Sequence, residues 1–317
     1  MEAFFSMLGS VAIFVALAVP GFLLVKTKTL KAEQSIALSK LLMWVGMPFL
    51  ILSSTLRLRF TETLLKGMGL SFAITLGYVA VWFFITAFLT RKEGDVKKQG
   101  MLRFAMMFSN NGFLGLPLAA AVLGEGSDAY LYLVISNVLT NLLMYTIGVY
   151  YISGDKKNMN LKKVILNPVL ISFVIGVILN LLNVVEYVPQ VLTYSDHLKG
   201  IVTPVSMVIL GMKMASVKLP TLFTNKKVYI VSVLKLIAVP VGAVIIAYFF
   251  GEWSGVGAAL AFAMLIAFGT PTAGLASTFA DAYDGDEEGA AVYTLGSTLL
   301  SVASLSILYW LLSLIVA

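Results

Sequence analysis

Ten apolar segments dominate this 317-residue chain, and each is close to the length of a membrane-spanning helix. A helix that crosses the hydrocarbon core of a bilayer needs about 20 mostly apolar residues. The segments are residues 4–25, 36–54, 68–89, 101–123, 129–151, 164–182, 200–216, 228–250, 255–280 and 289–316. Because 59% of the residues are hydrophobic and only 12% are charged, a soluble protein of this length could not bury them in one core. The sequence therefore predicts an all-α polytopic membrane protein with ten transmembrane helices.

The composition also excludes several classes of function. The chain has no cysteine and one histidine, so we expect no disulfide, no metal site and no bound cofactor. We find no serine–histidine, paired-aspartate or His-Glu-x-x-His pattern inside the segments, which argues against an enzyme. The net charge of +6 comes from short basic runs between apolar segments, as in a membrane protein, and does not indicate a nucleic-acid partner. The only coupling ion left open is sodium, held by hydroxyl and carbonyl oxygens.

The basic residues predict how the chain is oriented in the membrane. Loops after the odd-numbered spans hold most of them: Lys26, Lys28, Lys31, Arg91, Lys92, Lys97, Lys98, Lys156, Lys157, Lys162, Lys163, Lys218, Lys226 and Lys227. The alternate loops hold only Arg57, Arg59, Lys66 and Lys199. Since basic loops stay in the cytoplasm, we expect a multi-pass protein of the cell membrane with both termini outside.

The two halves of the chain resemble each other. "FAMMFSNNGFLGLPLAAAVLGEG" (104–126) and "FAMLIAFGTPTAGLASTFADAYDG" (262–285) both begin with Phe-Ala-Met and continue into a stretch interrupted by glycine and proline. Their offset, 262 minus 104, is 158 residues, which is half the chain. Each half, 1–155 and 156–317, holds five spans, so the second must enter the membrane from the opposite side. Paired interrupted helices in two such halves indicate a transporter's binding site.

The interrupted fourth and ninth spans are the strongest candidates for that site. A broken helix leaves unpaired N–H and C=O groups that must be buried in protein or line a cavity. We expect new half-helices near Pro117 and Pro271, and if the spans cross, the positive ends of their dipoles favour a bound anion. The candidate ligands at these breaks are the side chains of Asn110, Asn111, Thr270 and Thr272, with Gly115 and Gly269 allowing close approach. The alternative is a tightly packed, kinked helix pair with its asparagines satisfied across the interface.

Two polar stripes supplement these candidates. Asn137 and Asn141 lie in the fifth span, and Ser297 and Thr298 lie at corresponding positions in the tenth. Each set lies within about one helical turn, so it could line a cavity or form ordinary bonds between helices.

Lys235 is the clearest charge inside a span, about seven residues into the eighth. A cation at membrane depth predicts an attractor for an anion, although a lysine near a span end can also extend to the membrane surface. Pro48 and Pro204 are expected to kink the second and seventh spans and are candidate hinge or gate residues.

Several stretches together resemble bacterial, malate- or malonate-permease-like members of the auxin efflux carrier family. They are "SNNGFLGLPLAAAVLG", "LNPVLISFVIGVILN", "VTPVSMVILGMKM", "VLKLIAVPVGA" and "GTPTAGLASTFADAYDGDEEGAAVYTLGSTLLS". The resemblance implies two inverted five-helix repeats, a fold shared with bile acid/sodium symporters. It also implies a homodimer, a scaffold domain of spans 1, 2, 6 and 7, and a transport domain of spans 3–5 and 8–10. Residues 152–163 are too few for the long central loop of many plant carriers.

The resemblance implies organic-anion substrates such as malate, malonate or auxin. It assigns the crossover prolines to Pro117 and Pro271, and a polar contact to Asn110 or Asn111. We therefore predict a secondary transporter that works by alternating access, by an elevator or rocking motion, with a carboxylate at the crossover. The alternatives are a sodium-coupled symporter of the bile acid type and a membrane sensor for similar ligands. The predicted partners are the organic anion and the lipid bilayer.

Overall fold

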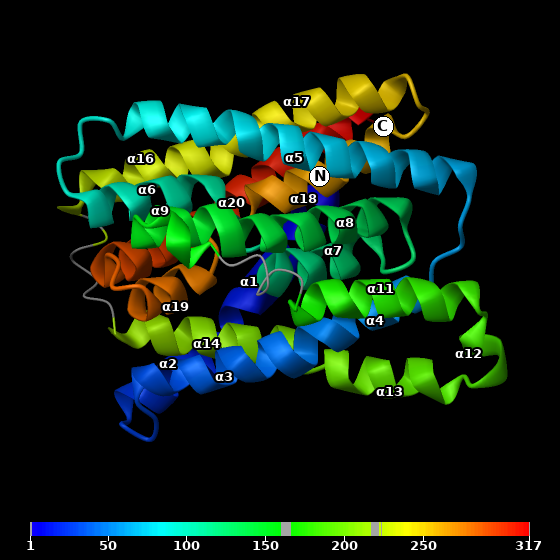
Figure 1. Ribbon diagram of the computed structural model, residues 1–317, viewed down its shortest axis with the longest axis horizontal. Helices are drawn as coiled ribbons and strands as arrows, with labels where there is room; N and C mark the ends of the chain where they lie inside the picture. Colours follow the sequence, from blue (N-terminus) through cyan, green and yellow to red (C-terminus); the bar gives the residue numbers. More distant parts are fainter. Residues whose placement is uncertain (1, 160–165, 217–221, 223, 317) are drawn as a thin grey trace.

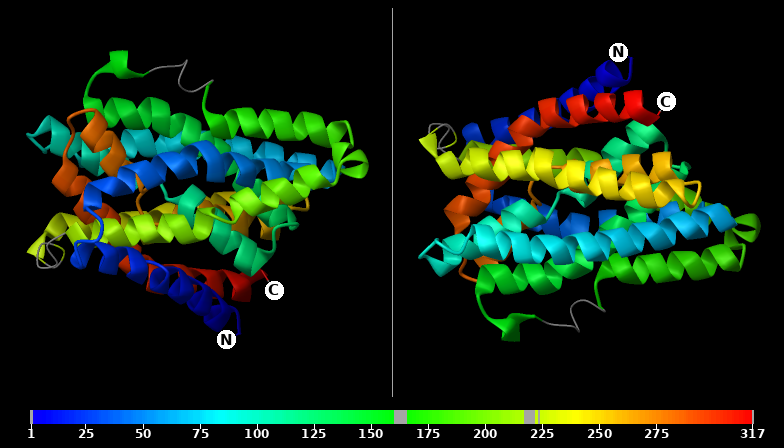
Figure 2. Two further views of the ribbon diagram at one scale, coloured as in Figure 1. Left: turned by 90° about the horizontal axis from the view of Figure 1, so that it is seen from below. Right: turned by 90° about the horizontal axis from the view of Figure 1, so that it is seen from above.

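The computed structural model describes residues 2–159, 166–216, 222 and 224–316, and these ranges form helices without any β-strand (Figure 1). Most helices run roughly along one direction, as expected of a bundle that crosses a bilayer. The two ends of the chain lie near each other in both views of Figure 2, where α1 (Glu2–Ala16) packs along α20 (Glu287–Val316). The all-helical prediction is confirmed for the described residues.

Helices occupy all ten predicted segments. The first half forms α1, α2 (Val19–Lys26), η1 (Ala32–Gln34), α3 (Ser35–Leu41), η2 (Leu42–Gly46), α4 (Met47–Leu56), α5 (Glu62–Leu89), α6 (Val96–Met107), η3 (Asn111–Gly115), α7 (Leu116–Leu123), α8 (Asp128–Leu143), η4 (Met144–Gly148), α9 (Val149–Ser153) and η5 (Lys156–Asn158). The second half forms α11 (Pro168–Leu181), α12 (Val184–Tyr187), α13 (Gln190–Lys199), α14 (Val202–Ser216), α16 (Lys226–Val233), η6 (Leu234–Ala238), α17 (Val239–Glu252), α18 (Gly257–Gly269), α19 (Leu275–Ala282) and α20. Residues 164 and 165 of the sixth segment lie outside the described ranges.

Seven helical stretches of the described chain are long and apolar enough to cross a membrane. They are Met7–Lys26, Ala32–Leu56, Glu62–Leu89, Asp128–Ser153, Gln190–Ala215, Lys226–Glu252 and Glu287–Val316. The remaining predicted spans contain the shorter apolar helices Asn111–Leu123, Pro168–Leu181 and Gly257–Gly269, because two of these spans are broken. The stretch Gln190–Ala215 begins ten residues before the predicted start of the seventh span at residue 200, since only Gly200 and Ile201 separate α13 from α14.

The helices pack in two groups. In one group α4 lies between α11 and α13, and α14 lies beside α2 and α3 (Figure 1). In the other, α18 packs against α17 and α8, α5 packs against α8, and α20 packs against α16 and α19. The first group contains the second, sixth and seventh spans and half of the first. The second group contains the third to fifth and eighth to tenth spans. α1 contacts α20 of the second group although it belongs to the first span.

Prolines account for several irregular turns. A π-helical stretch of five residues lies just before Pro48, Pro117 and Pro240, as η2, η3 and η6. Proline cannot donate to the carbonyl four residues earlier and its ring pushes that carbonyl away, so the helix widens there. Pro48 thus disturbs the second span as predicted. Pro204 lies in the first turn of α14, and the seventh span is interrupted just before it, at Gly200 and Ile201. The carbonyl of Gly200 is the one that the ring of Pro204 would displace in a continuous helix, so the span is disturbed where predicted.

Two glycines hold α2 and α14 unusually close. A Cβ on Gly211 would lie 1.8 Å from the backbone oxygen of Ala18, and one on Gly21 would lie 2.0 Å from that of Val208. Small residues at such crossings let membrane helices approach closely.

We expect Gly211→Ala to lower the free energy of unfolding by about 1–3 kcal/mol, because the two backbones must separate. Thermal unfolding of the purified protein in detergent measures the effect. Gly69→Ala is the matched control, since a Cβ there has nothing within 4 Å and lies on an exposed face of α5. Equal melting temperatures for the two variants would contradict the close approach.

Candidate functional site at the helix crossover

The fourth and ninth predicted spans are both interrupted, and the interruptions meet. α6 ends at Met107 and η3 starts at Asn111, while α18 ends at Gly269 and α19 starts at Leu275. Ser109 and Thr272 form an isolated antiparallel bridge between the two breaks. The backbone N–H of Asn110 donates to Pro271 O at 2.7 Å, and the N–H of Ala273 donates to Phe108 O at 2.9 Å. The backbone groups freed by each break thus pair with the other break, which is how irregular backbone is tolerated at membrane depth.

The two prolines take different places from the predicted ones. Pro271 lies in the non-helical connection, and the second half-helix starts only at Leu275, because the residues up to Ala273 are engaged in the bridge. Pro117 lies in the first turn of α7, but the chain is already helical from Asn111. The positive end of that half-helix is therefore at Asn111, six residues nearer to the crossover than Pro117.

Hydroxyl groups hold the bridge from both sides. Thr272 Oγ1 donates to Ala105 O at 3.0 Å, and the Thr272 N–H donates to Ser297 Oγ at 3.1 Å. Ser297 Oγ also donates to Tyr293 O at 2.7 Å, and Thr298 Oγ1 donates to Thr294 O at 2.6 Å. Thr272, Ser297 and Thr298 are all buried. In this conformation the hydroxyls of these predicted ligands form hydrogen bonds with backbone groups of the protein.

We expect Thr272→Val to destabilise the protein by about 1–3 kcal/mol, because it keeps the side-chain shape but leaves Ala105 O without its side-chain donor. Thermal unfolding in detergent tests this, with Thr193→Val on the exposed face of α13 as the control. A melting temperature as high as that of the control would show that the hydroxyl does not support the break.

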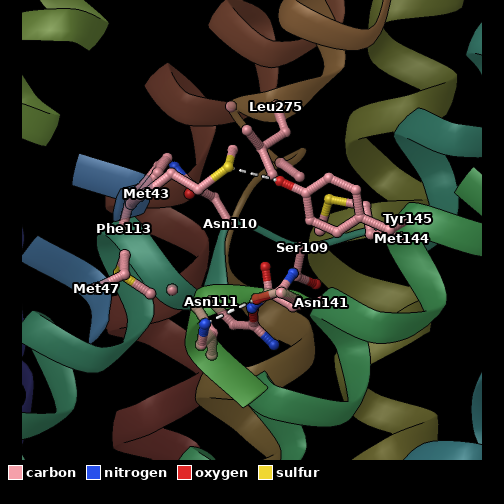
Figure 3. A pocket seen from close by; sticks show the side chains of 15 residues that line it. Met43, Met47, Ser109, Asn110, Asn111, Phe113, Asn141, Met144, Tyr145 and Leu275 are labelled. Atoms are coloured by element: carbon pink, nitrogen blue, oxygen red, sulfur yellow. Dashed lines mark hydrogen bonds between the residues drawn. The ribbon is translucent and has the colours of Figure 1, made fainter. Parts of the chain in front are cut away.

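A small pocket adjoins the bridge (Figure 3). Its volume is about 30 Å³. Polar lining comes from Ser109, Asn110, Asn111, Asn141 and Asn167, and the remaining walls include Met43, Met47, Met144, Tyr145, Val169 and Leu275. Of the twelve residues predicted to bind substrate, the pocket therefore brings together Asn110, Asn111 and Asn141.

The two adjacent asparagines have different surroundings. Asn111 is buried, and its Oδ1 accepts from Asn137 Nδ2 at 3.0 Å. Asn141 Nδ2 donates to Asn137 O at 2.9 Å. Asn110 is half-buried, and within the described chain its side-chain amide makes no hydrogen bond. Asn111 and Asn137 thus make one hydrogen bond between the fourth and fifth spans, but Asn111 Nδ2 and Asn137 Oδ1 have no partner among the described residues. The side-chain amide of Asn110 remains available to a ligand.

Gly115, Gly269 and Thr270 do not line the pocket. A Cβ on Gly115 would lie 3.4 Å from Thr270 Cγ2, and one on Gly269 would lie 3.0 Å from Leu305 Cδ2. Thr270 is fully buried, and its Oγ1 has no partner among the described residues. These three positions allow the broken helices and their neighbours to pack closely.

Lys235 lies at the crossover and does not extend to the membrane surface. It belongs to η6 and has no exposed area. Its Nζ donates to Ser109 Oγ in the first break and, at 2.9 Å, to Phe268 O at the end of α18. The surface-extension alternative for this lysine is therefore wrong. Because Ser109 lines the pocket, the ammonium lies one side chain behind its wall.

Two further residues from α14 reach the breaks and were missed in the sequence. Lys213 Nζ donates to Gly274 O at 2.9 Å, and Ser206 Oγ donates to Phe113 O at 3.1 Å. Lys213 could have been found by the rule that singled out Lys235, because it is the only charge within 200–216. Nothing in the sequence indicated that Ser206 would contact η3.

The electrostatics of the site favour an anion. The half-helices that follow the two breaks begin at Asn111 and Leu275, and both residues line the pocket. The ammonium groups of Lys213 and Lys235 contact the connection at Gly274 and the end of α18. None of the described residues that line the pocket is acidic. Helix N-termini and nearby cations together stabilise negative charge.

Long apolar helices and paired, bridged helix breaks define a multi-pass membrane protein of the transporter class. A family model described as "Membrane transport protein" matches residues 6–163 and 156–309. The chain therefore belongs to this family, the auxin efflux carrier family. It is also similar to an uncharacterized transporter of Methanothermobacter thermautotrophicus, with 27% identity over 203 residues. The match covers 61% of this chain and 63% of that relative.

Proposed function

We propose that this protein is a secondary transporter of small organic anions, with the carboxylate bound at the helix crossover. The observation that carries the proposal is the pocket at the two breaks. Two half-helices begin there, and the side-chain amide of Asn110 makes no hydrogen bond within the described chain. A carboxylate accepts hydrogen bonds and carries negative charge, so it matches both features. Lys235 and Lys213 add positive charge behind the pocket wall.

We propose ten spans in two inverted five-helix repeats, over 1–155 and 156–317, with both termini outside the cell membrane. Breaks at corresponding positions of the halves support this, since they fall at 108–110 and 270–274. The family model also matches two stretches, each about half the chain. The basic loops support the orientation.

Transport by an elevator motion is part of the proposal. In this conformation the pocket has a volume of only about 30 Å³, so we expect it to widen when a dicarboxylate enters. It lies between α4 and α11 of one helix group and the broken helices of the other, so sliding of one group against the other would widen it. A homodimer formed through the group of α2, α4, α11 and α14 rests on the family resemblance.

Uptake by proteoliposomes tests the function. Purified protein is reconstituted and given radiolabelled malate, malonate or indole-3-acetate, with and without an inward sodium gradient. Saturable uptake of at least one carboxylate above protein-free vesicles is the expected result. Uptake that requires sodium would favour the symporter alternative. Saturable binding without uptake would favour a sensor, and neither binding nor uptake of any carboxylate would contradict the proposal.

A further inference from the structure

The feature that the proposed site does not itself require is the position of Lys235. Its ammonium contacts both breaks at once, through Ser109 Oγ of the first and Phe268 O at the end of α18. Ser109 Oγ is also 3.3 Å from Phe268 O, so the three polar groups form one cluster. All three residues are buried.

The partners of the ammonium are oxygens of the kind that hold a metal cation. The last carbonyls of a helix have no partner within the helix and carry the negative end of its dipole. Phe268 lies one residue before the end of α18, so its carbonyl belongs to this set. Carbonyl and hydroxyl oxygens are also the usual ligands of hard cations. An ammonium on a side chain supplies the same single positive charge as a sodium ion, but it cannot leave.

The charge of Lys235 is not balanced by a carboxylate. None of the ion pairs that the described residues form includes this lysine. A group buried at membrane depth without a counter-charge is costly, and that cost falls when an anion binds nearby. Ser109, which accepts from the ammonium, also lines the pocket, so an anion bound there would lie close to Lys235.

We propose that Lys235 is a tethered substitute for a coupling cation, so that transport by this protein is independent of sodium. This inference rests on the proposed function. When a monovalent carboxylate is bound, its negative charge balances the charge of Lys235, so the helix group that contains the breaks carries no net charge at the crossover. When the site is empty, the same group carries the one positive charge of Lys235. Membrane potential therefore acts on the return of the empty carrier, and no ion gradient has to be supplied.

Substitutions at Lys235 test the inference without requiring a known substrate. We compare thermal unfolding in sodium chloride and in choline chloride at equal ionic strength. The wild-type protein should unfold at the same temperature in both salts. Lys235→Ala removes the ammonium from Ser109 Oγ and Phe268 O, leaves space beside them and should lower the melting temperature. An ion that binds only the folded state stabilises it. The melting temperature of Lys235→Ala should therefore be several degrees higher in sodium chloride than in choline chloride. Lys235→Met fills the space and should not respond, and neither should Lys40→Ala, an exposed lysine of α3.

Uptake into proteoliposomes gives the second reading. Wild-type uptake should be the same with and without sodium, and Lys235→Ala uptake should fall about tenfold or more without sodium and recover partly with it. Sodium-dependent wild-type uptake would overturn the inference, as would full uptake by Lys235→Ala in sodium-free buffer. If Lys235→Ala does not fold, Lys235→Arg keeps the charge and should still transport without sodium. If no carboxylate is transported at all, the proposed function fails, while the sodium response of the melting temperature still decides the role of Lys235.

Discussion

Asn110→Ala is expected to lower the kcat/KM of carboxylate uptake by about 10- to 100-fold. The reason is the loss of one amide donor to a charged acceptor, and a hydrogen bond to a charged group contributes about 1.5–3 kcal/mol. The fold should tolerate this change, because the side-chain amide of Asn110 makes no hydrogen bond within the described chain. Initial rates over a range of concentrations separate this effect from a loss of active protein.

The comparison with Asn111 sharpens this test. Asn111 is buried and accepts from Asn137, so Asn111→Ala should lower thermal stability as well as uptake. Asn158→Ala, in η5 away from the crossover, is the control and should leave both unchanged. If Asn110→Ala transports at the wild-type rate, the substrate does not use this amide and the assignment of the site is wrong.

Cross-linking the two helix groups should abolish uptake. Lys199 in α13 forms an ion pair with Glu125, in the loop between α7 and α8, at 2.8 Å. This bond joins the groups that slide past each other in an elevator motion. Because the chain has no cysteine, Glu125→Cys with Lys199→Cys introduces the only two thiols. A short bis-maleimide that joins them should reduce uptake to the level of protein-free vesicles.

A cross-link within one group provides the control. Ser53 in α4 and Asp196 in α13 lie in the same group, with Ser53 Oγ donating to Asp196 Oδ1 at 2.6 Å. Ser53→Cys with Asp196→Cys, treated in the same way, should keep most of the uptake measured before treatment. If the variant with Glu125→Cys and Lys199→Cys still takes up substrate after complete cross-linking, sliding of these two helix groups is excluded as the transport motion.

The sequence predicted those features that depend on local pattern. Apolar segment length predicted the helices, and the runs around Asn110 and Pro271 predicted the two breaks, since glycine and proline disfavour a regular helix there. The half-helices begin at Asn111 and Leu275 and not at the prolines. The start at Leu275 depends on the bridge between Ser109 and Thr272, which are far apart in the sequence.

Contacts between distant helices could not be predicted in the same way. The sequence left the hydroxyl of Ser297 open between lining a cavity and bonding to another helix, and the structure shows that it accepts the N–H of Thr272. Helical spacing indicates which residues share a face, and it does not indicate which helix covers that face. For the same reason the sequence could not tell whether the side chain of Lys235 extends to the membrane surface or into the interior. Its direction is decided by the contacts of its ammonium with Ser109 and Phe268.

The most direct test of the central claim is whether a carboxylate protects the crossover pocket from chemical labelling. Met43→Cys introduces a single thiol in the pocket wall, in place of the sulfur that accepts from Tyr145 Oη at 3.0 Å, and Met159→Cys introduces one at an exposed site after η5. The rate of reaction with a small methanethiosulfonate is measured with and without a carboxylate that the protein transports. We expect saturable slowing at position 43 and none at position 159. If the labelling rate at position 43 is the same with and without saturating carboxylate, a substrate site at the helix crossover is contradicted.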